Sequence, residues 1–106
     1  MGDAQRALPG GVQENICMAY VYLLKSLKDL DNYIGSTPYL EQRIKQHHDG
    51  LVVSTKCRRP LKLIGYRETE TLGEARILEH KYKKSHGVLS RDIKNKLFKI
   101  INNNGV

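Results

Sequence analysis

Residues 19–36, AYVYLLKSLKDLDNYIGS, decide the fold that we expect for this chain of 106 residues. Two short runs rich in β-branched and aromatic residues, 19–25 and 32–36, flank a polar turn that contains Lys28 and Asp29. Runs of this composition favour strands, and a short polar loop between them is typical of an antiparallel hairpin. Apolar and aromatic residues occupy both alternating sets of positions in the first run, so we expect that strand to be covered on both faces.

The residues after the hairpin predict a helix and then a third strand. Thr37 fits the N-cap position, and Pro38 fits the first position of a helix that we expect to end at Gly50. Residues 52–60 then form a polar, basic loop, and the run 61–67 after it has the composition of a strand.

The last third of the chain predicts two more helices. Thr71 and Glu74 have the spacing of a capping box, which opens a helix that runs to about residue 84 and stops at Gly87. Ser90 is the expected cap of a final helix. The apolar stripe of that final helix consists of Ile93, Leu97, Ile100 and Ile101.

The predicted element order is ββαβαα, which indicates a single α/β (α+β) domain over residues 18–101. We expect a three-stranded sheet that begins with the N-terminal antiparallel hairpin and is flanked by three helices. Residues 1–17 lack periodicity and are expected to be a flexible leader, and residues 102–106 are expected to be a polar tail.

The charge of the chain is positive and unevenly placed. Lys and Arg number 18 against 11 Asp and Glu, which gives a formal net charge of +7. Residues 41–106 carry fifteen basic and seven acidic side chains, a net of +8. A small basic domain attracts polyanions, so nucleic acid is the expected partner. The alternative is that the charge serves only to keep the protein soluble.

The sequence argues against a membrane protein or a secreted disulfide scaffold. No apolar run approaches the roughly 20 residues that a membrane span needs, and the N-terminus lacks the apolar core of a signal peptide. Two cysteines, Cys17 and Cys57, are too few for a disulfide framework. We therefore expect a cytoplasmic protein, and we expect it to be a monomer.

Five polar side chains fit poorly into a purely structural interpretation. Arg43 and His47 lie one turn apart on the edge of the buried face of the first helix, where an arginine can also simply extend along the core edge. Glu79 falls inside the apolar stripe of the next helix, so it is either ion-paired, for instance with Arg43, or a metal ligand. Tyr22 and Tyr33 face each other across the predicted hairpin, either as aromatic packing or as hydroxyl groups of a site.

The motifs around these residues resemble those of the GIY-YIG endonucleases. Residues 20–22 (YVY) and 33–35 (YIG), separated by ten residues, are similar to the paired motif that names the family. Arg43 follows ten residues after Tyr33, and a Glu-Ala-x-x-x-Glu motif ends at Glu79. The resemblance covers roughly residues 18–100 and is greatest to the small stand-alone bacterial members, similar to the nuclease domain of excision-repair endonucleases.

Two positions depart from the family pattern. Tyr20 stands where the first motif usually has glycine, a change that this subgroup tolerates. Ser36 follows the second motif, whereas the excision-repair members carry a lysine nearby. His47 and Lys56 are then the candidates for assisting the base.

The resemblance implies metal-dependent hydrolysis of phosphodiesters in nucleic acid, with DNA as the expected substrate and DNA repair or recombination as the expected context. Tyr22 would be the general base with Tyr33 close by, and His47 would orient or deprotonate it. Arg43 would grip the scissile phosphate, and Glu79 would hold one Mg²⁺ or Mn²⁺ ion. We expect these side chains to converge on one concave surface, with Glu79 on the same side of the sheet as Arg43.

Four further residues are predicted to contact nucleic acid. Lys56, Arg58 and Arg59 lie in the basic loop before the third strand and are expected, together with Gly35, to follow the substrate backbone. The alternative for this loop is an ordinary solvated basic turn.

Two other functions stay open from the sequence. One is a nucleic-acid-binding module that is catalytically silent or is recruited by a protein partner that supplies targeting. The other is a zinc site built from the two cysteines and four histidines, although their spacing matches no standard Cys/His pattern.

Overall fold

The computed structural model describes residues 18–101, so the expected leader and polar tail lie outside the described residues. The elements in chain order are β1 (Ala19–Ser26), β2 (Asn32–Thr37), α1 (Leu40–His48), α2 (Val53–Lys56), β3 (Leu61–Thr69), α3 (Leu72–Lys84), α4 (His86–Lys94) and β4 (Lys99–Ile100). The strands form one four-stranded sheet of order β2-β1-β3-β4, in which every neighbouring pair is antiparallel.

The predicted N-terminal hairpin is confirmed. β1 pairs with β2 so that Tyr22 lies opposite Gly35 and Leu24 lies opposite Tyr33. β1 also pairs with β3 along its other side, which makes it an interior strand and leaves β2 at one edge of the sheet. The residues that carry the family motifs therefore lie on an interior strand and on the edge strand beside it.

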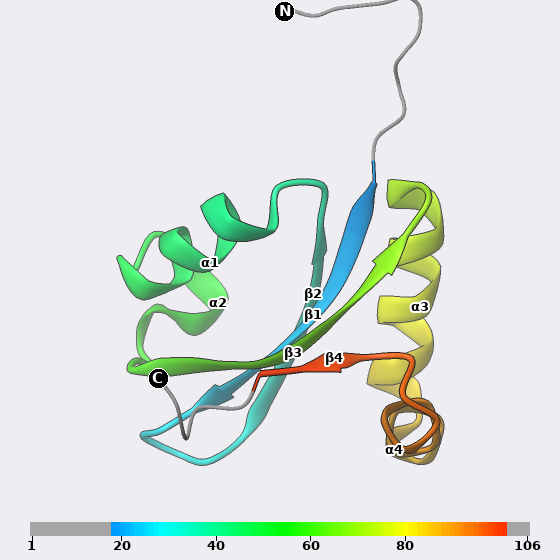
Figure 1. Cartoon of the computed structure of the whole chain (residues 1–106). Helices are drawn as coiled ribbons and strands as arrows, with labels where there is room; N and C mark the ends of the chain where they lie inside the picture. Colours follow the sequence, from blue (N-terminus) through cyan, green and yellow to red (C-terminus); the bar gives the residue numbers. More distant parts are fainter. Residues whose placement is uncertain (1–17, 102–106) are drawn as a thin grey trace, which may run out of the picture.

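The sheet is covered on both faces, as the composition of β1 predicts. Figure 1 shows α1 and α2 on one side of the sheet and α3 and α4 on the other. Val21 and Leu23 pack into the apolar core beneath α3 and α4, whereas Tyr22 and Leu24 belong to a second cluster on the α1 side. Because side chains alternate along a strand, the motif tyrosine Tyr22 points toward α1.

The N-terminus of α3 follows the sequence expectation. The hydroxyl of Thr71 accepts a hydrogen bond from the backbone N–H of Glu74, and the Glu74 carboxylate accepts one from the N–H of Glu70. These bonds satisfy donors that the first turn of a helix leaves without partners.

Helix α1 begins later in the sequence than expected. Its N-cap is Tyr39 instead of Thr37, and no side chain caps it. Thr37 instead ends β2 and accepts a hydrogen bond from the backbone N–H of Tyr39. The loop 52–60 also contains the short helix α2, which the sequence did not indicate.

The C-terminal region differs most from the expectation of a final helix over residues 90–101. α4 begins at His86 with Ser85 as its N-cap, so Ser90 lies inside the helix and Gly87 does not stop α3. Lys96, with a φ of 65°, adopts the left-handed conformation that ends helices. The residues beyond it form β4, where Ile100 pairs with Gly65 of β3.

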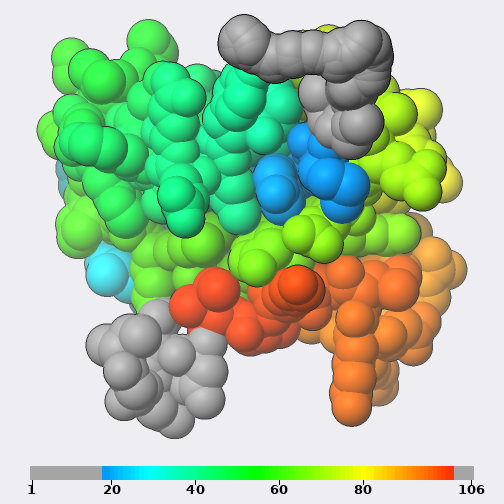
Figure 2. All heavy atoms as spheres, turned by 45° about the horizontal axis from the view of Figure 1, so that its top comes forward, coloured from blue at the N-terminus to red at the C-terminus, as the bar shows by residue number. Residues whose placement is uncertain are grey.

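Figure 2 shows the red β4 segment lying directly against β3, with the orange α4 beside it. The sheet thus has four strands instead of the three expected. Among the helices formed by residues 18–101, none combines the length and apolar character needed to cross a membrane.

Candidate active site

Tyr22 lies at the centre of the candidate site, and Gly35 makes its position possible. The Tyr22 side chain is almost completely buried between β2 and α1. A Cβ atom at Gly35 would lie 2.4 Å from both Cζ and the hydroxyl oxygen of Tyr22, so only glycine leaves room for the ring. Gly35 is itself buried, and what it contributes is space for Tyr22 instead of the nucleic-acid contact that we expected of it.

His47 joins Tyr22 to a residue of α2. Its Nε2 lies 2.9 Å from the Tyr22 hydroxyl, and its Nδ1 lies 2.7 Å from Oγ1 of Thr55. Both His47 and Thr55 have no exposed surface. Tyr22, His47 and Thr55 therefore form one buried hydrogen-bonded relay, in which the imidazole is held at both nitrogens.

The surroundings keep both ionisable groups of this relay neutral. Burial, followed by the nearby charges of Arg43 and His48, lowers the pKa of His47 to about 4. Burial is also the main reason that the pKa of Tyr22 is raised to about 12, with Arg43 acting in the opposite direction. At neutral pH the imidazole carries one proton, so one of its nitrogens accepts a hydrogen bond while the other donates one.

Tyr33 lies beside this relay on the same face of the sheet. Its ring centre is 5.2 Å from that of His47 and 6.3 Å from that of Tyr22. The ammonium group of Lys83, on α3, lies 5.8 Å from the centre of the Tyr33 ring. The two motif tyrosines are thus diagonal neighbours on the hairpin and not directly opposite each other as expected, and a cation from α3, on the opposite face of the sheet, lies near Tyr33.

Arg43 lies close to the relay and lines an open hollow. One guanidinium nitrogen donates a 3.0 Å hydrogen bond to Oε1 of Gln46, and within residues 18–101 no carboxylate forms an ion pair with Arg43. Arg43 lines a hollow of about 280 Å³ together with Ser36 of β2 and Arg76 of α3. Two arginines from opposite faces of the sheet therefore meet beside the edge strand β2.

Glu79 reaches this region from the opposite face of the sheet, which corrects the expectation of a single concave face. It lies on α3, where its Oε1 accepts a 2.5 Å hydrogen bond from the Ser36 hydroxyl and its Oε2 pairs with Lys83 at 2.8 Å. Ser36 directly follows Gly35, and the Glu79 charge contributes to raising the pKa of Tyr22. The candidate site therefore straddles the edge strand β2. The ion pair of Glu79 is with Lys83, not with Arg43.

The donor set around Glu79 suits a hard divalent cation with a single protein carboxylate. The Glu79 side chain is 21% exposed, and its two oxygens contact the Ser36 hydroxyl and the Lys83 ammonium group. Mg²⁺ and Mn²⁺ prefer oxygen ligands and keep several waters, which substrate phosphates can replace. Within the described part of the chain, no group of three or more His, Cys, Asp or Glu side chains is placed to hold a metal, which gives the zinc alternative no support there.

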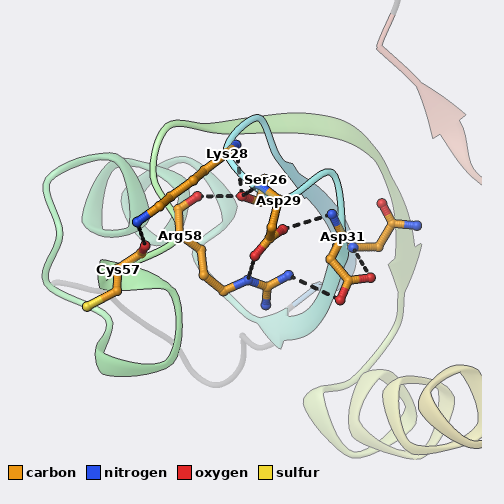
Figure 3. A network of polar contacts seen from close by, with 7 residues as sticks. Ser26, Lys28, Asp29, Asp31, Cys57 and Arg58 are labelled. Atoms are coloured by element: carbon orange, nitrogen blue, oxygen red, sulfur yellow. Dashed lines mark hydrogen bonds and ion pairs between the residues drawn. The ribbon is translucent and has the colours of Figure 1, made fainter.

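The basic loop divides its three cations between two roles. Figure 3 shows Arg58 held in the turn between β1 and β2: its Nε lies 3.1 Å from Asp29 Oδ2, and one of its Nη atoms lies 3.9 Å from Asp31 Oδ2. Arg58 is thus engaged inside the protein, against our expectation of a nucleic-acid contact. Lys56 and Arg59 on either side of it are exposed.

Sequence reasoning missed four residues of this region. The ion pair of Lys83 with Glu79 has the spacing of i and i+4 on a helix, which is a readable signal. Ser36 was noticed only as a departure from the family pattern. Thr55 and Arg76 carried no signal, because their proximity to the site depends on how α2 and α3 pack against the sheet.

Comparisons with known proteins identify the family of the chain. The model of the GIY-YIG catalytic domain family matches residues 18–91. The chain is 43% identical over 68 residues to the UPF0213 protein CPE1444 of Clostridium perfringens (strain 13 / Type A), an alignment that covers 63% of this chain and 72% of that protein. No solved structure matches the chain. The chain therefore belongs to the GIY-YIG family, whose catalytic domain has a nuclease fold.

Proposed function

We propose that the protein is a metal-dependent nuclease that hydrolyses phosphodiester bonds in nucleic acid, with DNA as the expected substrate. The observation that carries the proposal is the buried Tyr22–His47 hydrogen bond beside a hollow lined by Arg43 and Arg76. Attack of water on an anionic phosphate needs a group that accepts the water proton and positive groups that stabilise the phosphate charge. The Tyr22–His47 pair and the two neighbouring guanidinium groups can supply these.

Tyr22 acts as a proton relay in this proposal. With a pKa of about 12, its phenolate is scarcely populated at neutral pH. As the water oxygen bonds to phosphorus, the water proton passes to the Tyr22 oxygen, and the Tyr22 proton passes to Nε2 of His47. The bond from phosphorus to the leaving oxygen breaks, and that oxygen takes a proton from solvent. His47, neutral because its pKa is lowered to about 4, is free to receive the relayed proton.

Thr55 determines which nitrogen of His47 is available. Its hydroxyl oxygen lies 2.7 Å from Nδ1, and in this proposal it accepts the Nδ1–H of the imidazole, so that Nε2 carries no proton and faces the Tyr22 hydroxyl. The opposite tautomer would present an N–H to Tyr22 and would block the relay. Thr55 is therefore a positioning residue that acts through His47.

Arg43 and Arg76 bind the scissile phosphate in the hollow beside β2. A guanidinium group presents a planar fork of N–H donors that matches two phosphate oxygens. Because no carboxylate within residues 18–101 neutralises Arg43, its charge is available to a substrate.

Glu79 is the residue that would hold Mg²⁺ or Mn²⁺, with the Ser36 hydroxyl orienting its carboxylate. When bound, such a cation neutralises phosphate charge and favours departure of the leaving oxygen. Lys83, which is half exposed and pairs with Glu79 at 2.8 Å, would have to leave this carboxylate for such a cation to bind there, because two cations repel each other.

The proposal is tested by incubating the full chain with labelled duplex DNA, branched DNA, single-stranded DNA and RNA. We expect cleavage of at least one substrate in Mg²⁺ or Mn²⁺ and none in EDTA. Preference for branched DNA would support a role in repair or recombination. Binding without cleavage under every condition would instead identify a binding module that is silent or needs a partner.

A further inference from the structure

A second cationic hollow lies outside the candidate active site, at the end of the molecule where the β1–β2 turn meets α2. Its volume is about 700 Å³, and four basic side chains line it: Lys28, His48, Lys56 and Arg59. The exposed thiol of Cys57 also lines it. No carboxylate is among the residues that line this hollow, which distinguishes it from a region of mixed surface charge.

Three carboxylates close in sequence to these residues form ion pairs with side chains outside the hollow, and one of them is Asp49, which follows His48 and pairs with Lys45 at 2.7 Å. Asp29 and Asp31 pair with Arg58, whose backbone carbonyl also accepts a 2.6 Å hydrogen bond from the Ser26 hydroxyl (Figure 3). Arg58 therefore neutralises the acidic turn and ties it to the loop after α2. The charges of the neighbouring Lys56 and Arg59 are left for a ligand.

Two of the cations are fixed by backbone carbonyls instead of acidic side chains. The Lys28 ammonium donates to the carbonyl of Cys57 at 3.2 Å, and Arg59 Nε donates to the carbonyl of Lys56 at 3.1 Å. Within residues 18–101, no acidic side chain forms an ion pair with Lys28 or Arg59. The cations are thus held in place without loss of their positive charge.

The cationic hollow adjoins the candidate active site through consecutive residues. His47 and Thr55 belong to the buried relay, whereas the next residues along the chain, His48 and Lys56, line the hollow. The end of α1 and the short helix α2 therefore each contribute one residue to the buried relay and one residue to the cationic hollow. A polynucleotide strand carries one phosphate per nucleotide, so a strand held at the active site has further phosphates on either side of the scissile one.

We propose that this hollow binds a backbone phosphate of the substrate strand other than the scissile phosphate. The inference rests on the proposed function, since it extends the substrate along the surface beyond the bond that is cut. The ammonium and guanidinium groups bind the phosphate oxygens and release the counterions that the strand carries. The hollow thereby sets how the strand lies across the active site.

The first test measures binding of a labelled single-stranded or duplex oligonucleotide in EDTA. The Lys28→Ala/Lys56→Ala variant removes two exposed cations from the hollow. A matched variant, Lys81→Ala/Lys94→Ala, removes two exposed lysines from α3 and α4 on the other face of the sheet. Because each phosphate contact releases counterions, the loss of one contact should weaken binding roughly fivefold at physiological salt.

We expect the Lys28→Ala/Lys56→Ala variant to weaken binding about 25-fold and to reduce the slope of log affinity against log salt by about two. The matched variant should change affinity less than about threefold, through net charge alone. Equal weakening of the two variants would overturn the proposal, because it would mean that only overall charge matters. Melting curves verify that both variants are folded.

The second test uses Cys57 as a reporter inside the hollow. In the Cys17→Ser protein, alkylation of Cys57 by N-ethylmaleimide should slow at least about fivefold when the oligonucleotide is bound, and high salt should reverse the effect. An unchanged rate at saturating oligonucleotide would overturn the proposal. Protection by inorganic phosphate but not by the oligonucleotide would also overturn it, because the site would then belong to free phosphate.

These outcomes separate the inference from the proposed function. A wild-type protein that cleaves DNA while Cys57 stays unprotected would refute the second phosphate site and leave the nuclease proposal standing. A protein that protects Cys57 and never cleaves would refute the nuclease proposal and leave the phosphate site standing.

Discussion

The molecule buries two tyrosines in two polar clusters, one on each face of the sheet, and their partners differ. On the α1 face, Tyr22 meets the neutral His47. On the α3 face, Tyr82 donates a 2.6 Å hydrogen bond to Asp92, and Arg67 contacts both groups at 2.7 and 3.2 Å. Burial raises the pKa of each tyrosine to about 12, so burial alone does not distinguish them.

The difference lies in how each cluster balances charge. Tyr82 and Arg67 contact one carboxylate oxygen of Asp92, and the more exposed Arg91 contacts the other at 3.3 Å. The Tyr82 hydrogen bond is the main reason that the pKa of Asp92 is lowered. That cluster is closed and joins α3, α4 and β3. Within residues 18–101, the hydrogen-bonded relay of Tyr22, His47 and Thr55 contains no carboxylate, and the nearby Glu79 is paired with Lys83. Arg43, whose charge acts on Tyr22, lines an open hollow together with Arg76. A buried polar cluster whose charges balance stabilises the fold. A cluster that lies next to arginines without a carboxylate partner is instead suited to bind an anionic ligand.

The largest expected difference comes from removing each hydroxyl in turn. Tyr22→Phe should reduce metal-dependent cleavage by about 10²–10⁴-fold, because it removes the relay, while the domain stays folded. Tyr82→Phe should leave cleavage within about threefold and lower the melting temperature, since it removes a partner of a buried carboxylate. Cleavage rates and melting curves of both variants check this. Equal loss of cleavage in the two variants would refute the division of roles.

A second contrast concerns the two acidic residues of the α3 side. Asp92→Asn leaves Arg67 short of a counter-charge in a buried pair, which should cost about 3–5 kcal/mol and lower the melting temperature by more than about 10 °C. Glu79→Gln breaks only the more exposed pair with Lys83, so stability should be unchanged or slightly higher while metal-dependent cleavage is lost.

Melting curves and a Mn²⁺ cleavage assay on both variants provide the measurement. A Glu79→Gln protein that is clearly destabilised yet still cleaves would contradict the metal-ligand assignment of Glu79.

The clusters should also respond differently to acid. The pKa of His47 is lowered from 6.5 to about 4. Between these pH values the unfolded chain therefore binds a proton at this imidazole, whereas the folded protein does not. Stability is therefore fully present above pH 6.5 and falls by about 3 kcal/mol as the pH drops to about 4. The pKa of Asp92 is lowered too, and its contribution is lost only in more acidic solution, below its ordinary value of 3.8.

Urea denaturation across this pH range tests the assignment. His80→Gln removes an exposed histidine and should keep the same pH dependence, whereas His47→Gln should flatten it. A slope that survives in His47→Gln would assign the acid sensitivity to another group.

The smallest expected effect concerns Thr55, which acts only through His47. Thr55→Val keeps the shape and removes the acceptor for Nδ1–H, so kcat should fall about tenfold with KM little changed. Thr55→Ser keeps a hydroxyl and should restore most of the rate. Nitrogen NMR shifts of the His47 ring report the tautomer directly. Thr55→Val with an unchanged tautomer and rate would exclude the positioning role.

The parts of the fold that sequence patterns predicted are those decided locally. The hairpin around residues 19–36 follows from two strand-like runs and the short turn between them. The start of α3 follows from one cap residue, Thr71, whose partner is three positions away. The motif tyrosines and Arg43 were found because their spacing along the chain is itself a signature.

The parts that were missed depend on distant partners. The apolar residues after Asp92 fit a helix stripe and a strand equally well, and the outcome depends on the left-handed Lys96 and on pairing with Gly65. Likewise the helical periodicity of the sequence placed Glu79 in the apolar stripe of its helix. It gave no information on which face of the sheet that helix would cover. Thr55 is part of the site only because α2 folds back against His47.

The close approach of β4 to β3 determines how much of the edge of β3 is left open. A Cβ atom at Gly65 would lie 2.8 Å from the carbonyl oxygen of Lys99, so the two chains come together only because this position lacks a side chain. β3 runs for nine residues and would otherwise present a long row of free backbone groups, which is a template for strand addition. Two residues of β4, followed by the bond from the Ile101 N–H to the Ile64 carbonyl, interrupt that row near its middle. The missing side chain at Gly65 thus allows β4 to pair with the middle of the β3 edge and to use backbone groups that would otherwise be free.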